Sequence, residues 1–412
     1  MFFAPLKQQK FYTGFLIVSL LIISLLLVGC NTDRSFDARL NSIVKPYLFG
    51  IAGWEFKAIP QEIGQWLSGG QEEVDDEIRI VIEYYDYVKR IKSLKSEIEL
   101  VRENNEEAAL SSLQDELSRL EEERTALIVK VESIIEKQIR DTLAEQGIFN
   151  PAGGSESTFP PVKFRLEQLP SVLVISPIDR IESIREYTLK PGLIRSEKES
   201  IEERVDELEV SSLVTEIGGI ATYPSLVDSQ TSLRYAIDTV IEEWLHQYLA
   251  FKPLGFRYVL DLTGISRDYE IVTINETLAD MVGDEMGSIV YEKYYSGYEN
   301  SSSNTSVEGF DFDGEMREIR KAVDEYLIRG EIEQAEEFME EKRQYLVSEG
   351  HYIRKLNQAY FAFHGAYADR PAFENPIGVE LRELRNRSKS LKDFLDTAAA
   401  MTSRQDLKAS IR

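Results

Sequence analysis

Apolar residues spaced alternately three and four positions apart dominate the N-terminal part of this 412-residue chain. This is heptad spacing, which places apolar side chains on one stripe of a helix and requires a partner helix to bury that stripe. The ENNEE run at 103–107 interrupts the pattern, so we expect two helices folded as an antiparallel hairpin over 77–146. A continuous coiled coil that forms a homodimer through the same residues is the alternative. The stripe consists of Tyr84, Tyr87, Ile91, Leu94, Ile98, Val101, Leu110, Leu113, Leu117, Leu120, Leu127, Val131 and Ile134.

Clusters of Gly, Pro and Ser divide the rest of the sequence. Residues 31–76 are expected to form a linker and an aromatic-rich segment, and PAGGSEST at 151–158 separates the hairpin from a core over 159–298. Within that core, KFRLEQL and the β-branched run at 171–177 predict strands, as does most of 211–227. A polar loop at 299–315 precedes a helical C-terminal region over 316–412. Together these segments predict an α+β fold that is rich in helix.

The first thirty residues carry the marks of an export signal. Lys7 and Lys10 precede an apolar run from Phe15 to Val28, and the run ends in LLVGC. This ending matches the lipobox of bacterial lipoproteins, so we expect cleavage before Cys30 and lipidation of its thiol. An uncleaved single transmembrane anchor is the alternative. Either way the body would lie on the extracytoplasmic face of the bacterial cytoplasmic membrane, and no disulfide is expected because Cys30 is the only cysteine.

The charge balance argues against one class of binding partner. Lys and Arg number 47 against 72 acidic residues, which gives a formal net charge of -25. Such a charge repels the phosphates of nucleic acids, so no nucleic-acid partner is expected.

One helix could carry chemistry. Residues 233–249 have a broad apolar face, and the stretch IEEWLHQYLAF at 241–251 adds three polar residues to it. Glu242 and His246 are four positions apart and share a face, and Glu243 precedes His246 by three, so all three can border one point. Two buried carboxylates there would be costly without a cation or hydrogen-bond donors.

A second segment strengthens this interpretation. TINETLADMVGDEMG at 273–287 predicts a helix on which Glu276 and Asp280 share a face. A third ligand supplied by a following helix is the arrangement of metallopeptidases that use two histidines and a glutamate.

These two segments together resemble a known pair of motifs. EEWLHQYL and NETLADMVGDEMG are similar to the HEWxHHYL and NEGxAD motifs of the gluzincin zinc metallopeptidases, in particular the bacterial predicted aminopeptidases. GGIATYPSLV at 218–227 is similar to the edge strand that lies along a peptide substrate in those enzymes, and 356–373 resembles a segment near their C-termini. The resemblance covers about 140–373 loosely and excludes the helical arm.

The resemblance implies roles for individual residues. Glu243 matches the general base that activates water, and His246 and Glu276 match metal ligands. Asp280 matches an acid that would orient His246 through its other ring nitrogen. Candidate donors to a developing oxyanion are Asn275 and either Tyr360 or Tyr367. The implied activity is hydrolysis of a peptide or protein substrate.

Glu242 departs from the pattern, because it stands where the resemblance implies a first histidine ligand. If Glu242 binds the ion, two carboxylates cancel the charge of a divalent metal, and the oxygen-rich site admits manganese or iron besides zinc. His351 or His364 could instead supply the missing ligand. A further alternative is an inactive, peptidase-like binding module in which Glu242 pairs with Arg234 or Lys252. An envelope scaffold built on the coiled-coil arm is the third class.

Overall fold

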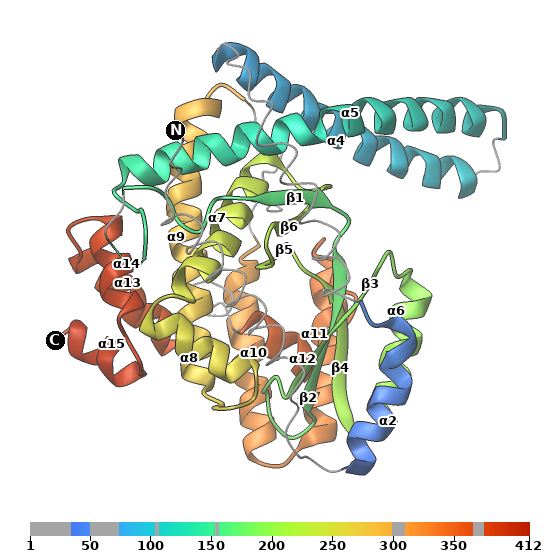
Figure 1. The fold of residues 1–412 in the computed structure, drawn as a ribbon. Helices are drawn as coiled ribbons and strands as arrows, with labels where there is room; N and C mark the ends of the chain where they lie inside the picture. Colours follow the sequence, from blue (N-terminus) through green and yellow to red (C-terminus); the bar gives the residue numbers. More distant parts are fainter. Residues whose placement is uncertain are drawn as a thin grey trace.

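The computed structural model describes residues 34–49, 74–103, 107–151, 153, 156–298, 310–365 and 375–412. The fold is helix-rich with small sheets, which confirms the predicted α+β class. Figure 1 shows a body of helices and strands from which one helical hairpin extends. The signal segment with Cys30, and the candidate donor Tyr367, lie outside the described residues. Within them, no helix is long and apolar enough to cross a membrane.

The helices before the first strand are α2 (Arg34–Val44), the short 3-10 helix η1 (Lys45–Tyr47), α4 (Val74–Glu103) and α5 (Glu107–Glu145). The strands are β1 (Phe164–Glu167), β2 (Pro170–Pro177), β3 (Arg185–Pro191), β4 (Val210–Glu216), β5 (Gly219–Ile220) and β6 (Ser225–Asp228). The remaining helices are α6 (Arg195–Asp206), α7 (Leu233–Leu249), α8 (Pro253–Leu262), α9 (Tyr269–Tyr295), α10 (Phe312–Ile328), α11 (Ile332–Ser348), α12 (Gln358–His364), α13 (Pro376–Arg387), α14 (Leu391–Ala399) and α15 (Arg404–Ser410).

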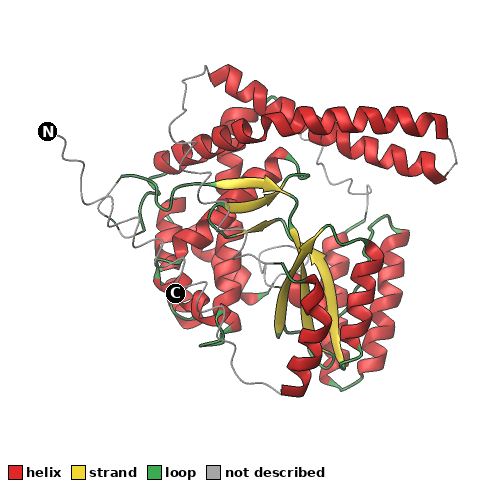
Figure 2. Ribbon diagram, turned by 45° about the vertical axis from the view of Figure 1, so that its right-hand side comes forward, coloured by secondary structure: helices red, strands yellow, loops and turns green. Residues whose placement is uncertain are grey.

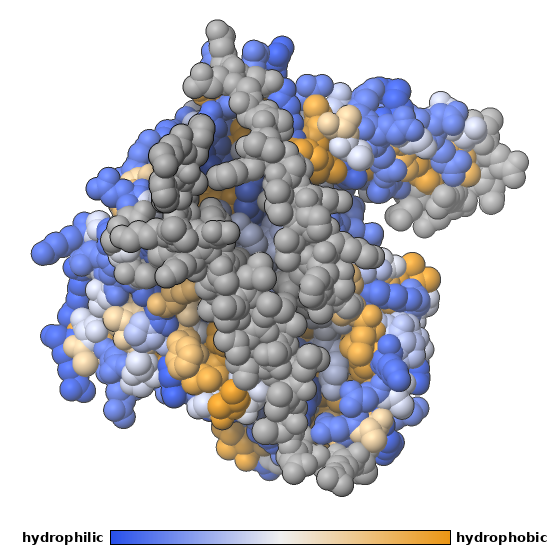
Figure 3. Space-filling view, in the orientation of Figure 1, coloured by the Kyte–Doolittle hydropathy of each residue, from blue (hydrophilic) through white to orange (hydrophobic). Residues whose placement is uncertain are grey.

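The heptad stripe forms the seam of the hairpin. Helices α4 and α5 pack against each other, and Ile91, Leu94, Ile98 and Leu120 are buried between them. A salt bridge of 2.9 Å joins Arg90 to Glu116 across the seam. Hydrophilic residues cover most of the described surface of this arm (Figure 3). The intramolecular pairing of α4 with α5 occupies the stripe that a dimer through 77–146 would need.

The larger sheet has the order β3-β2-β4 and is antiparallel throughout. Its central strand β2 is buried at nearly every position, as the β-branched run predicts. Helices α2 and α6 pack on one face, and α12 packs on the other through Ala359 and Phe363. Figure 2 shows helices (red) on either side of the strands (yellow).

The smaller sheet has the order β1-β6-β5. Strands β1 and β6 are parallel, with Phe164 opposite Ser225, while the short β5 pairs antiparallel with β6. Helix α7 packs beside this sheet and against α9, and the buried apolar residues of both helices belong to the main hydrophobic core. Helices α13, α14 and α15 pack around α9.

Several elements differ from the sequence-based expectation. The expected linker contains α2, whose Leu40 and Val44 are fully buried against the larger sheet. Strand β3 and helix α8 were not predicted. The residues of β3 are mostly partly exposed and show no clean alternation, and α8 is a ten-residue helix that follows α7 after a short turn. The core expected at 159–298 holds two separate sheets, and the larger one is completed by α2 before it and α12 after it in the chain.

Candidate metal centre

Helix α7 carries the first part of the site. The hydroxyl of Ser232 caps it by accepting a hydrogen bond from the backbone N–H of Tyr235. Its buried apolar residues anchor it in the core, as the predicted apolar face requires. The helix spans the expected residues 233–249 and holds Glu242, Glu243 and His246 in its last two turns.

Helix α9 carries the second part and lies very close to α7. Small residues permit this approach: a Cβ added at Gly283 would come within 3.2 Å of the Asp238 carbonyl oxygen, and one at Gly287 would overlap the Asp238 carboxylate. The Asp268 side chain caps α9, and Asn275 in its second turn is fully buried. Close packing of the two helices brings Glu276 opposite His246.

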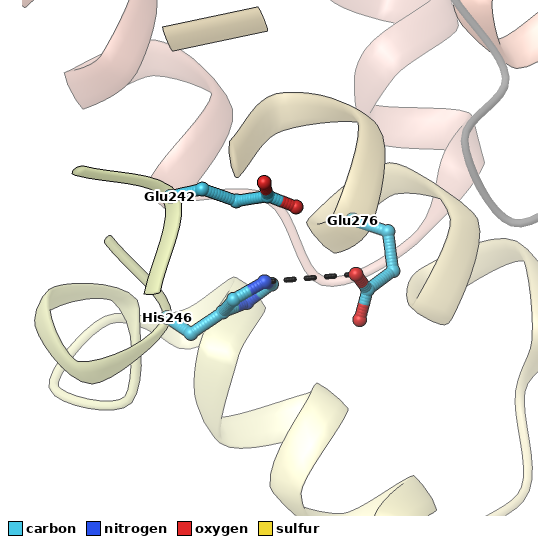
Figure 4. A group of neighbouring side chains, drawn as sticks. All are labelled: Glu242, His246 and Glu276. Atoms are coloured by element: carbon cyan, nitrogen blue, oxygen red, sulfur yellow. Dashed lines mark ion pairs between the residues drawn. The ribbon is translucent and has the colours of Figure 1, made fainter. Parts of the chain in front are cut away.

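Glu242, His246 and Glu276 converge on one point (Figure 4). Each offers one ligand atom, and these atoms all lie within 4.8 Å of one another. The Nε2 atom of His246 is 3.6 Å from Oε2 of Glu276. The structure therefore brings together the three residues that the sequence nominates as metal ligands.

The hydrogen bond of His246 decides which ring nitrogen is available. The Asn275 side-chain oxygen lies 2.9 Å from Nδ1, so Nδ1 carries the proton and donates it to that oxygen. In the neutral ring, Nε2 then presents a lone pair toward the Glu276 carboxylate. Two acceptor atoms that face each other at this distance repel unless a cation or a second proton lies between them. The donor set and its geometry fit a divalent cation.

This bond also bears on the expected role of Asp280. Asn275, rather than Asp280, supplies the acceptor that orients His246 through its second ring nitrogen. An amide serves this purpose as well as an acid, because the ring nitrogen needs only an acceptor. Asn275 was also expected to donate to an oxyanion through its amide nitrogen, and that role stays a prediction, since the bond to the imidazole uses only the side-chain oxygen.

Tyr258 belongs to the site and was not predicted. It lies on α8, and its hydroxyl donates a hydrogen bond of 2.5 Å to Oε1 of Glu276. Its ring stacks on the imidazole of His246, with centroids 5.7 Å apart and an interplanar angle of 19°. The spacing of the two motifs contains no sign of this contact, because α8 folds back between them in the chain.

Glu243 lies beside the three converging residues and is 8% exposed. Burial raises the pKa of its carboxyl group well above the usual value, and the negative charges of Glu242 and Glu276 raise it further. The edge strand β5 runs against this carboxyl group, since a Cβ added at Gly219 would overlap Glu243 and Thr239. The Gly-Gly pair thus allows side chains of α7, rather than another backbone, to approach the strand.

The other histidines and Tyr360 make contacts of a different kind. His351 stacks between Phe310 and Phe312, with ring centroids 5.1 and 4.6 Å away, and His364 packs on Tyr360. Neither histidine belongs to the metal-ligating group found among the described residues. Tyr360 is partly buried beneath the larger sheet, and burial raises its pKa to about 12.

The two basic residues suggested as partners of Glu242 have other contacts. Arg234 pairs with Asp238 at 2.9 Å and with Asp284 at 2.8 Å. Lys252 lies over the ring of Tyr248.

Comparisons of the chain with protein-family models, with curated proteins and with solved structures return no match. The functional argument therefore depends on the geometry of this site.

Proposed function

We propose that the protein is a membrane-tethered, extracytoplasmic metal-dependent peptidase of aminopeptidase-like type. The observation that carries the proposal is the convergence of Glu242, His246 and Glu276 beside the buried carboxyl group of Glu243. Two carboxylates and one imidazole would hold a single divalent ion, zinc or alternatively manganese or iron. When bound, that ion would act as a Lewis acid on the substrate carbonyl and lower the pKa of water.

Residues of the chain would transfer the proton and orient the metal ligand. Glu243 would accept a proton from the attacking water and return it to the nitrogen of the leaving amine, so that the C–N bond breaks and one water is consumed. Asn275 holds the imidazole of His246 in the tautomer that leaves Nε2 available.

Strand β5 supports a peptide as substrate. It is an edge strand of the smaller sheet, and no described strand pairs with its outer edge. An extended peptide can add to such an edge through main-chain hydrogen bonds. Because Gly219 packs directly on Glu243, a peptide added at this edge would lie beside the proposed base.

The test is hydrolysis of a peptide library by the full chain loaded with zinc or manganese, with products identified by mass spectrometry. We expect cleavage that a chelator removes and that falls at least about 1000-fold in Glu243→Gln, which removes the proton acceptor. Glu292→Gln, at an exposed position on helix α9, is the control and should cleave normally. Metal binding without cleavage of any peptide would contradict the proposal.

The second candidate is an inactive, peptidase-like binding module. It is favoured by Glu242, which replaces the histidine implied by the resemblance and leaves the bound ion with less positive charge. If this candidate is correct, the wild type and Glu243→Gln should bind peptides along β5 equally well, and neither should hydrolyse them.

A further inference from the structure

Tyr258 contacts two of the three proposed ligands at once. Its hydroxyl donates to Oε1 of Glu276 at 2.5 Å, and its ring lies parallel to the imidazole of His246. The other carboxylate oxygen of Glu276, Oε2, faces Nε2 of His246. The phenol therefore distinguishes the two oxygens of Glu276: one is occupied by a hydrogen bond and the other is directed at the site.

The imidazole is held on two sides. Asn275 accepts a hydrogen bond from Nδ1 at the ring edge, and the Tyr258 ring lies nearly parallel to the imidazole, with its centroid 5.7 Å away. Tyr258 itself is fixed, because it is partly buried and packs against the main hydrophobic core. A rigid phenol on a short helix thus restrains both the ring plane of His246 and the rotation of the Glu276 carboxylate.

We propose that Tyr258 is a positioning residue that restricts Glu276 to one ligating oxygen and thereby sets the coordination number and metal preference of the site. This inference rests on the proposed metal site. A carboxylate that ligates through one oxygen suits the low coordination number of zinc. Ions that take six to eight oxygen ligands, such as calcium, use bidentate carboxylates and are disfavoured. Tyr258 thus offsets the tendency of the additional carboxylate, Glu242, to attract harder ions.

The experiment compares the full chain with Tyr258→Phe, which removes only the hydroxyl, after loading with cobalt(II). Four-coordinate cobalt(II) absorbs visible light several-fold more strongly than six-coordinate cobalt(II). We expect strong absorption in the wild type and a clear loss of intensity in the variant, because Oε1 is released to bind the ion. We also expect zinc affinity to fall about 10- to 100-fold, as when residues that support metal ligands are removed. Manganese affinity should fall less.

Tyr345→Phe, a partly exposed tyrosine on α11, is the matched control and should behave as the wild type. If both proteins bind cobalt with the same spectrum and the same ratio of zinc to manganese affinity, the role of Tyr258 is refuted while the metal site stands. If the wild type binds no cobalt, the proposed function itself fails. Should Tyr258→Phe not fold, a weak, six-coordinate spectrum of the wild type alone would overturn the inference.

Discussion

Helix α5 buries two carboxyl groups, whereas α7 buries Glu243 and leaves the neighbouring Glu242 partly buried, and the surroundings of the two pairs differ. On α5, Glu132 and Glu136 are 2% and 4% exposed and face the edge strand β1. Glu132 pairs with Arg165 at 2.9 Å and accepts the backbone N–H of Leu166 at 2.8 Å. Glu136 is bonded in the same way to Lys163 and to the N–H of Phe164. Each of the two carboxylates thus faces one cationic side chain and accepts one backbone hydrogen bond. We call this arrangement of Glu132 and Glu136 against β1 the clamp.

The pair on α7 has different neighbours. The charged groups that act on the Glu243 carboxyl within the described residues are Glu242 and Glu276, both negative. In the clamp, by contrast, Arg165 opposes the effect of burial on Glu132. On α5, residues of the chain supply the positive charges and backbone donors that face the buried carboxylates. Beside Glu243 the charged neighbours are negative, and the proposed metal ion would supply a positive charge there.

The largest expected effect is on the clamp. Glu132→Ala should lower the free energy of unfolding by about 3 to 5 kcal/mol, because it removes the buried carboxylate that pairs with Arg165 and accepts the Leu166 N–H. Urea denaturation of the full chain measures this change. Glu122→Ala, on the exposed face of the same helix, should change stability by no more than about 0.5 kcal/mol. Equal effects of the two substitutions would contradict the structural role of the clamp.

Gly219→Ala should destabilise the protein by about 1 to 3 kcal/mol, because its Cβ would overlap Glu243 and Thr239. It should also reduce peptide hydrolysis, since the Glu243 carboxyl group would be displaced. Gly297→Ala is the control, because nothing lies within 4 Å of a Cβ there. A Gly219→Ala protein with normal stability and activity would show that β5 does not restrain the base.

Glu243→Gln should change the free energy of unfolding in the opposite direction to Glu132→Ala. In metal-free protein it should raise the free energy of unfolding by about 1 kcal/mol, because a neutral amide replaces a buried carboxyl group whose pKa is raised by burial and by the charges of Glu242 and Glu276. Thermal or urea unfolding in the presence of a chelator measures this. Destabilisation by Glu243→Gln would remove the distinction between the two carboxylate pairs.

A smaller effect is expected from pH. Burial, opposed by Arg165, raises the pKa of Glu132 from 4.5 to about 7 in the folded protein. Between these values the folded state binds more protons than the unfolded state, so stability falls as pH rises, with a slope of at most about 1.4 kcal/mol per pH unit from this group. Glu132→Gln should remove that part of the slope between pH 5 and pH 7. An unchanged slope in this variant would show that Glu132 titrates at its ordinary pKa.

Periodicity was enough to predict the hairpin and helix α7, because heptad spacing and a broad apolar face are local properties of the sequence. The spacing of Glu242, Glu243 and His246 likewise follows from helical geometry. Glu276 could be placed beside them only through the resemblance to gluzincins, since its contact with His246 joins two different helices.

The contacts that sequence reasoning missed all join distant segments. Tyr258 lies between the two motifs, where a tyrosine is indistinguishable by pattern from an aromatic residue of the core. Glu132 of the clamp contacts Arg165, which lies beyond a predicted domain boundary. The role of Asn275 was missed for a different reason. The resemblance directed attention to the acid Asp280, although an amide oxygen satisfies the imidazole N–H equally well.

The most direct test of the account is the metal content of the full chain, purified without a metal-affinity tag and analysed by elemental mass spectrometry. We predict close to one equivalent of zinc, manganese or iron in the wild type and in His351→Ala, whose histidine packs between phenylalanines away from the site. His246→Ala should contain none. No bound metal in the wild type after dialysis against these ions, or full retention in His246→Ala, would contradict the account.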